Sequence, residues 1–125
     1  MKFTIDKKER HTIFKLDEQK LNSVNAPILK SELILLNTEG FKNIILDLNE
    51  VAYSDSSGLS SLLVGNRLCS SSGGSLVICN LQPAVEKLIT ISQLDNVLNI
   101  VPTTQEAEDF VMMEEVAREF DTKSE

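Results

Sequence analysis

The sequence is poor in the residues that build metal, redox and catalytic sites. Its 125 residues include no tryptophan, a single histidine and two cysteines. Cys69 and Cys79 do not form a C-x-x-C pair, so we expect no zinc site and no other cofactor. Both thiols are interpreted as buried structural groups. His11 lies at a predicted strand edge, where we expect a structural role.

Basic charge and long apolar runs are also scarce. The chain has 12 basic and 19 acidic residues, a net charge of -7. This balance disfavours nucleic-acid binding, because phosphate contacts need a basic patch. No apolar run approaches the about 18 residues of a membrane span, and the start "MKFTIDKKERHTIF" lacks the apolar segment of a secretory signal. We therefore expect a cytoplasmic protein with reduced thiols, no membrane insertion and no direct contact with nucleic acid.

Short apolar patterns predict the strands. Apolar and polar residues alternate over residues 3–5 and 12–16, which is the period of half-buried strands, and the polar residues 7–10 form the turn between them. Nearly continuous apolar runs are typical of strands covered on both faces. Two such runs and a weaker edge strand are predicted, at residues 43–48, 75–79 and 96–101.

Turn and capping residues delimit four predicted helices. They run from Pro27 to Gly40, from Ser56 or Ser57 to Gly73 and Gly74, over a short stretch that begins at Pro83, and over residues 103–120. In the last helix, Thr103 and Glu106 have the spacing of a capping box. One face of that helix is apolar, and we expect it to pack on the sheet, with a partner groove as the alternative; it contains Ala107, Phe110, Met113, Ala117 and Phe120.

This order of elements predicts one α/β domain over residues 1–125. Strands that alternate with helices indicate a mostly parallel sheet, to which the N-terminal hairpin adds an antiparallel part. We expect a central mixed sheet of four to five strands with about four helices. The core should span about residues 3–118, with a frayed tail at 121–125.

The stretch "DLNEVAYSDSSG" lies where a strand ends and the next helix begins, the usual place for a site in such a sheet. Asp55, Ser56 and Ser57 are all suitable N-cap residues. A catalytic serine needs a histidine base, and His11 lies on the distant first hairpin. The serine elbow G-x-S-x-G and the nucleotide-binding loop G-x-x-x-x-G-K-[ST] are both absent. We therefore expect no enzyme activity, and a hydrolase that uses Ser57 is disfavoured.

The residues around this stretch resemble a known family. "VAYSDSSGLSSLL", with "NIILDL" before it and "GGSLVICNLQPAVEKLI" after it, is similar to the STAS domain family of anti-sigma factor antagonists. The resemblance covers roughly residues 3–118 and implies the STAS fold. It also implies that Ser57 accepts a phosphate from a partner serine kinase, which is itself the anti-sigma factor. The unphosphorylated antagonist binds that kinase and frees a sigma factor, and a serine phosphatase reverses the modification.

The resemblance also implies a partner-binding surface. Its residues in this chain are Asn22, Tyr53, Asp55, Ser56, Ser57, Gly58 and Leu59. One departure lies in "DEQKLNSVNA", where family members carry a Gly-Glu-Leu-Asp-like turn. Asn22 stands where the family's final Asp is expected, which keeps hydrogen bonding but removes a charge.

Two functions are compatible with these residues. The first is the phosphorylation-controlled antagonist, acting as a monomer or weak dimer. The alternative is a constitutive STAS adaptor subunit of a lipid-transport ABC complex, in which the same loop docks a nucleotide-binding subunit without phosphorylation.

Overall fold

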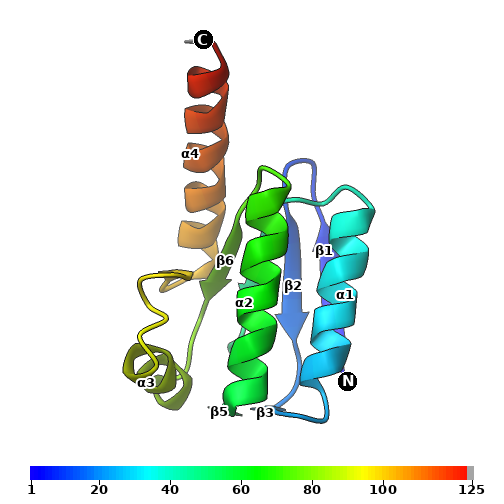
Figure 1. The fold of residues 1–125 in the computed structure, drawn as a ribbon, viewed down its shortest axis with the longest axis vertical. Coiled ribbons are helices and arrows are strands. Elements are labelled where there is room, and N and C mark those ends of the chain that lie inside the picture. The colour runs from blue at the N-terminus through cyan, green and yellow to red at the C-terminus, as the bar shows by residue number, and fades with distance from the viewer. Residues whose placement is uncertain (124–125) are drawn as a thin grey trace.

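The computed structural model describes residues 1–123, with side chains to residue 120, and contains seven strands and four helices (Figure 1). The strands are β1 (Phe3–Lys7), β2 (Thr12–Leu16), β3 (Lys20–Leu21), β4 (Ile44–Asp47), β5 (Tyr53–Ser54), β6 (Leu76–Cys79) and β7 (Asn99–Val101). The helices are α1 (Ala26–Thr38), α2 (Ser56–Ser71), α3 (Pro83–Ile91) and α4 (Thr104–Lys123).

Five of the strands form one mixed sheet in the order β1-β2-β4-β6-β7. β1 pairs antiparallel with β2, and every other neighbour pair is parallel. In the hairpin Phe3 pairs with Leu16, and the Phe3 and Phe14 rings stack with centroids 5.0 Å apart. The predicted hairpin, the parallel core and the edge position of the last strand are confirmed.

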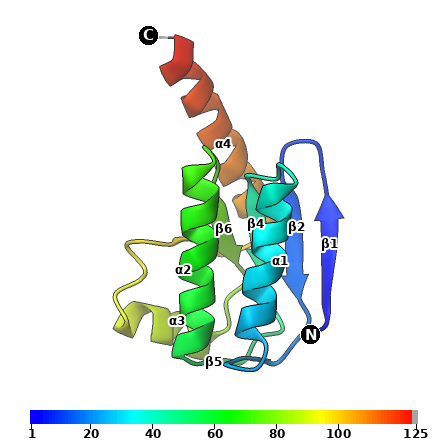
Figure 2. The same ribbon diagram turned by 45° about the vertical axis from the view of Figure 1, so that its right-hand side comes forward.

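Helices cover both faces of the sheet. α1 and α2 lie side by side on one face and α4 lies on the other (Figures 1 and 2). The central strands alternate between two cores: Ile44 and Leu46 point into the larger one with α1, α2 and α3, whereas Ile45 packs with α4. β6 alternates in the same way, which explains why its sequence is apolar at every position.

The two cysteines divide between these cores. Cys69 lies on the α1–α2 side and Cys79 on the α4 side, and both are fully buried, as predicted. Residues 1–123 contain no cluster of His, Cys, Asp and Glu able to hold a metal ion. Over the same residues, no helix combines the length and apolar character needed to cross a membrane.

The prediction that one stripe of α4 packs on the sheet along its whole length is wrong. Ala107 is buried and Phe110 half-buried, but Met113 is 68% exposed and Phe120 is 73% exposed, and Ala117 faces solvent as well. Ala107 and Val111, four residues apart, lie in the core on this face of the sheet, and the second half of the helix extends past the end of the sheet (Figure 1). The helix is described through Lys123, and residues 124–125 lie outside the described part; the frayed tail at 121–125 stays a prediction.

Candidate functional site

A two-stranded sheet too short to be predicted positions the candidate site. β3 pairs in parallel with β5, with Lys20 opposite Tyr53 and Leu21 opposite Ser54. The backbone N-H of Asp55 then donates to the carbonyl of Leu21 at 3.2 Å. These contacts fix the chain that leaves β5 and enters α2, at the end of the molecule where α2 begins (Figure 1). Two residues are too few to show a periodic pattern in the sequence.

Asp55 is the N-cap of α2. Its backbone is extended and its Oδ1 accepts the N-H of Gly58 at 3.0 Å. This contact selects one residue from the three candidate caps and leaves Ser56 and Ser57 as the first two residues of the helix. Ser56 is exposed and Ser57 is half-buried. Within residues 1–123 their backbone N-H groups have no hydrogen-bond acceptor, as is usual for the first turn of a helix.

Gly58 allows α2 to approach the short sheet closely. A Cβ atom at this position would lie 2.7 Å from the carbonyl oxygen of Leu21, and still closer to the hydroxyl oxygen of Ser54. Any larger residue would therefore push the start of α2 away from β3 and β5. The glycine of the D-S-S-G-L stretch has a steric role, and it is buried.

Ser57 opens onto a shallow hollow between the first turns of α1 and α2. The hollow has a volume of about 280 Å³, and Ser57 lines it with Ser56 and Ser60 from α2 and with Ser23 and Lys30 from the α1 side. Four serines and one ammonium group make this a polar surface with a local positive charge, on a chain that is acidic overall. The sequence did not reveal Lys30, because it lies far from Ser57 along the chain and only the packing of α1 on α2 brings the two together.

Asn22 forms a turn beside this hollow. Its Oδ1 accepts the N-H of Val24 at 3.0 Å, and its own N-H donates to Oδ1 of Asn25 at 2.8 Å. The buried Asn25 amide in turn donates to the carbonyl of Lys20 at 2.7 Å, which ties the turn to β3. Asn22 does not line the Ser57 hollow; it lines a neighbouring one of about 590 Å³ together with Val24 and Ile28.

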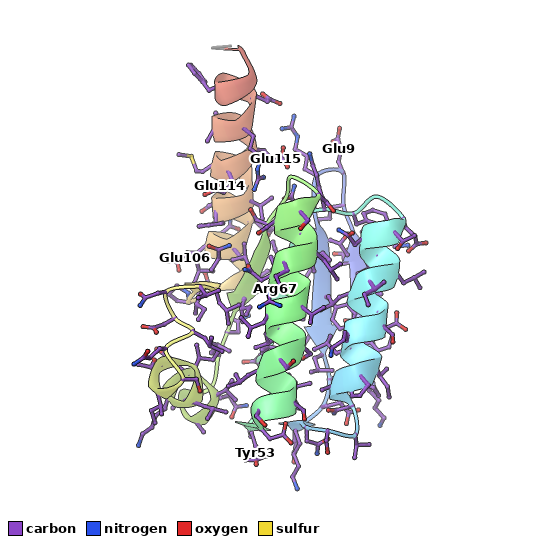
Figure 3. The ribbon with its side chains drawn as sticks, in the orientation of Figure 1. Glu9, Tyr53, Arg67, Glu106, Glu114 and Glu115 are labelled. Carbon is purple, nitrogen blue, oxygen red and sulfur yellow. The ribbon has the colours of Figure 1, made fainter. Side chains whose placement is uncertain are left out.

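The other predicted partner-binding residues divide between surface and core. Tyr53 is 53% exposed and projects from the end of the molecule where α2 begins (Figure 3). Val24 is also largely exposed, and it lines the neighbouring hollow with Asn22. Leu59, in contrast, is buried in the larger core, and together with Gly58 it positions α2 without presenting a side chain to a partner.

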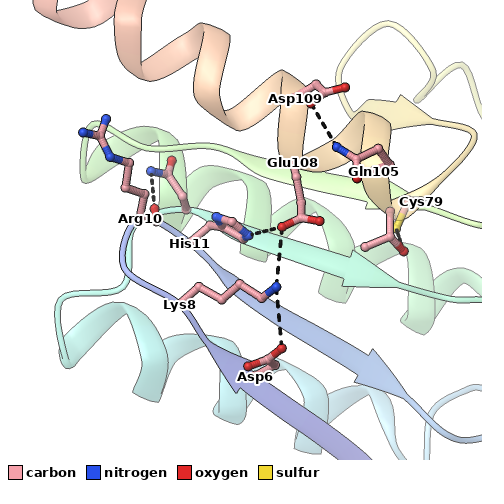
Figure 4. Close-up of polar contacts among 10 residues, drawn as sticks. Asp6, Lys8, Arg10, His11, Cys79, Gln105, Glu108 and Asp109 are labelled. Carbon is pink, nitrogen blue, oxygen red and sulfur yellow. Dashed lines mark hydrogen bonds and ion pairs between the residues drawn. The ribbon is translucent and has the colours of Figure 1, made fainter.

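No histidine lies near Ser57. His11 Nε2 is 2.9 Å from Glu108 Oε2 on α4, and Lys8 lies 3.7 Å from the same carboxylate oxygen (Figure 4). This cluster lies towards the end of the molecule that carries Glu9, opposite the end that carries Tyr53 (Figure 3). His11 therefore joins the hairpin to α4, and a Ser57–His11 catalytic pair cannot form.

A comparison with models of protein families identifies the family of this chain. A family model described as the STAS domain matches residues 2–107. The chain belongs to the STAS-domain family. The predicted resemblance is confirmed, and the match ends at Ala107, so most of α4 lies beyond it.

This STAS domain is similar to proteins that are named as anti-sigma factor antagonists. It is 33% identical over 108 residues to BtrV of Bordetella bronchiseptica, which is named as an anti-sigma factor antagonist; the match covers 86% of this chain and 90% of BtrV. A Thermotoga maritima structure with the same designation has a TM-score of 0.79 at 27% identity, over 88% of this chain and 94% of that one.

The fold of this STAS domain is also that of SpoIIAA. The unphosphorylated form of SpoIIAA, an anti-sigma factor antagonist, has a TM-score of 0.75 at 21% identity, over 89% of this chain and 96% of SpoIIAA. The phosphorylated form, from Bacillus, has a TM-score of 0.67 at 21% identity, over 88% and 99%. The predicted STAS fold, with a mixed five-stranded sheet and four helices, is confirmed.

Proposed function

We propose that this STAS domain is an anti-sigma factor antagonist whose partner binding is switched off by phosphorylation of Ser57. The observation that supports the proposal most is the position of Ser57: its side chain lines an open hollow at the first turn of α2, opposite Lys30. A hydroxyl in that position is accessible to the active site of a kinase. The chain contributes no catalytic machinery of its own to the reaction.

The first turn of α2 suits a phosphate physically. A phosphoserine carries about -1.5 to -2 charges at pH 7. The unpaired backbone N-H groups of Ser56 and Ser57 and the positive end of the helix dipole favour such a charge, and the Lys30 ammonium lines the same hollow. The carboxylate of Asp55 opposes it, although one carboxylate oxygen accepts the N-H of Gly58. The fold can therefore accept the phosphate without rearrangement, and the main change is the charge of the docking surface.

The proposed partners follow from the family. The unphosphorylated chain binds an anti-sigma factor serine kinase and so releases a sigma factor, and a serine phosphatase restores the binding form. Asn22 and Val24 line the neighbouring hollow and Tyr53 is exposed, and together with the Ser57 hollow they supply the mixed apolar and polar surface on which the kinase docks. The designation of BtrV as an anti-sigma factor antagonist supports the antagonist role.

The proposal is tested with purified kinase and variants of Ser57. Ser57→Asp should weaken kinase binding several-hundred-fold, because charge repulsion and desolvation remove about 3–4 kcal/mol. Ser57→Ala should bind as the wild type does and should gain no phosphate. Incubation of the wild type with kinase and ATP should add one phosphate to the peptide that contains Ser57, measured by intact mass and peptide mapping.

Ser70→Asp is the matched control. Ser70 is exposed near the other end of α2, so the variant adds the same charge to the same helix away from the hollow. It should bind the kinase normally. Equal binding by Ser57→Asp and the wild type would disprove the switch and would favour the constitutive adaptor.

A further inference from the structure

The second half of α4 is held to the body of the protein by polar contacts on its inner face. Nδ2 of the buried Asn43 donates to Oε1 of Glu115. One turn further along, Nη2 of Arg118 donates to the carbonyl of Gly74 at 2.9 Å and to Oγ of Ser75 at 2.7 Å. These contacts fix the orientation of the helix without using its outer face.

The outer face of the same segment is apolar and exposed. Met113, Val116 and Phe120 are 68%, 45% and 73% exposed, and Ala117 faces solvent beside them. Their spacing of i, i+3, i+4 and i+7 places them in one stripe, the pattern of a helix that docks into a groove. A contiguous exposed apolar patch of this kind marks an interaction site more often than scattered surface residues do. We call these four residues the α4 stripe.

The charge around the α4 stripe indicates what covers it. Two of the seven acidic residues of α4, Glu108 and Glu115, are paired with cations on its inner face. Glu106, Asp109 and Glu119 are exposed to solvent, and Glu106 projects from the helix in Figure 3. When a partner covers the α4 stripe, the residues at the edge of its groove lie beside these carboxylates. A rim of Lys and Arg is attracted to them, whereas an acidic rim is repelled.

We infer that the α4 stripe docks into an apolar groove with a basic rim on another protein. A second copy of this chain is disfavoured as the occupant, because the exposed carboxylates Glu106, Asp109 and Glu119 of the two helices would repel each other. The α4 stripe, from Met113 to Phe120, is also only about two turns long, shorter than the three to four heptads of a stable coiled coil. An anionic lipid surface is disfavoured for the same electrostatic reason.

This surface is separate from the Ser57 hollow. α2 begins at one end of the molecule, and the second half of α4 projects from the other (Figure 1). Most of α4 also lies beyond the part of the chain that matches the STAS family model. The inference therefore goes beyond the proposed kinase switch, and a Ser57→Asp variant should leave it unchanged.

The test uses the full chain, immobilised in three forms: the wild type, the double variant Met113→Ser/Phe120→Ser, and the control Ile34→Ser/Leu35→Ser. The control removes two apolar side chains of α1 that are exposed to a comparable extent. Proteins retained from a lysate of the encoding organism by the wild type and the control, but not by the α4 variant, are identified and purified. Each is then titrated with all three forms, and circular dichroism verifies that the variants are folded.

The expected result is one purified protein whose affinity for the chain falls about 30-fold in the α4 variant and is unchanged in the control. Its binding to the wild type should weaken as NaCl rises from about 50 mM to about 500 mM, because screening removes the attraction between acidic and basic rims. Retention of no such protein would overturn the inference. Equal binding of that protein by the wild type and the α4 variant would overturn it as well. So would a wild-type dimer in sedimentation equilibrium that is lost in the α4 variant. Binding to phosphatidylglycerol vesicles that is lost in the α4 variant would also overturn it.

Discussion

Gly58 shows how one residue sets the position of the candidate site. The carbonyl of Leu21 and the hydroxyl of Ser54 approach its Cα so closely that a methyl group has no room. In most helices alanine is about 1 kcal/mol better than glycine, so the effect of a substitution here should have the opposite sign.

Gly58→Ala should lower the free energy of unfolding by about 1–3 kcal/mol, because the added methyl group overpacks the contact between α2 and the β3–β5 sheet. Urea unfolding followed by circular dichroism measures the change. Ser60→Ala, on the exposed side of the same helix, serves as the control and should be neutral or slightly stabilising. A Gly58→Ala protein more stable than the wild type would show that the space between α2 and the β3–β5 sheet can hold a methyl group.

At the scale of elements, Asn43 joins three segments that are distant in sequence. Its Nδ2 donates to the carbonyl of Arg10 at 3.1 Å and to Glu115, and its Oδ1 accepts the N-H of Ser75 at 2.9 Å. The side chain is buried between the hairpin, the strand β6 and the helix α4. It therefore determines how α4 sits on the sheet.

Asn43→Ala should destabilise the protein by about 3 kcal/mol, because it leaves several buried polar groups without partners. Hydrogen exchange in the second half of α4 and at the tip of the hairpin should accelerate more than in α1. Asn96→Ala, at an exposed position, is the control and should change neither stability nor exchange. Uniform acceleration across all helices would contradict a specific role in seating α4.

The sequence predicted the helices and strands that have a clear periodic pattern of apolar residues or clear capping and turn residues at their ends. The hairpin, the central strands and all four helices are present, and Pro27 and Pro83 lie in the first turns of α1 and α3 as expected. It did not predict β3 and β5, whose pairing depends on tertiary contacts. The predicted apolar face of α4 is right at Ala107 and Phe110 but wrong beyond them, because the large exposed residues Met113 and Phe120 dominate the apolar pattern.

The candidate site could be predicted only in part. The D-S-S-G-L stretch identified Ser57, because both the local capping pattern and the family resemblance are contained in adjacent residues. The surroundings of Ser57 could not be predicted, because Ser23 and Lys30 come from another helix and its preceding turn. The choice of Asp55 as the cap required the backbone geometry.

At the scale of the whole molecule, each of the two cores contains one buried thiol, and burial shifts the pKa of both. Burial raises the pKa of Cys69 from about 9 to about 11, a shift reduced by a backbone hydrogen bond from Ile44. Burial likewise raises the pKa of Cys79 to about 11, opposed by a hydrogen bond with Thr104 and reinforced by the charge of Asp47. In the unfolded chain both thiols ionise near the ordinary value.

Stability should therefore fall as the pH rises from about 9 to about 11. In this window the unfolded chain loses thiol protons that the folded chain retains, so the free energy of unfolding decreases, by roughly 1 kcal/mol per thiol at pH 10. The measurement is urea unfolding at a series of pH values. The double variant Cys69→Ala/Cys79→Ala shares every other titrating group and should be less stable at neutral pH but show a flatter decline. Parallel declines in the two proteins would contradict the pKa shifts.

α2, which carries Ser57 in its first turn, begins at one end of the molecule, and the second half of α4 projects from the other (Figure 1). If both proposed partners bind, the sheet lies between them and keeps them apart. Such a bivalent scaffold raises the local concentration of one occupant around the other without any contact between them. Phosphorylation of Ser57 would then dismantle a ternary assembly from one side and leave the remaining pair intact.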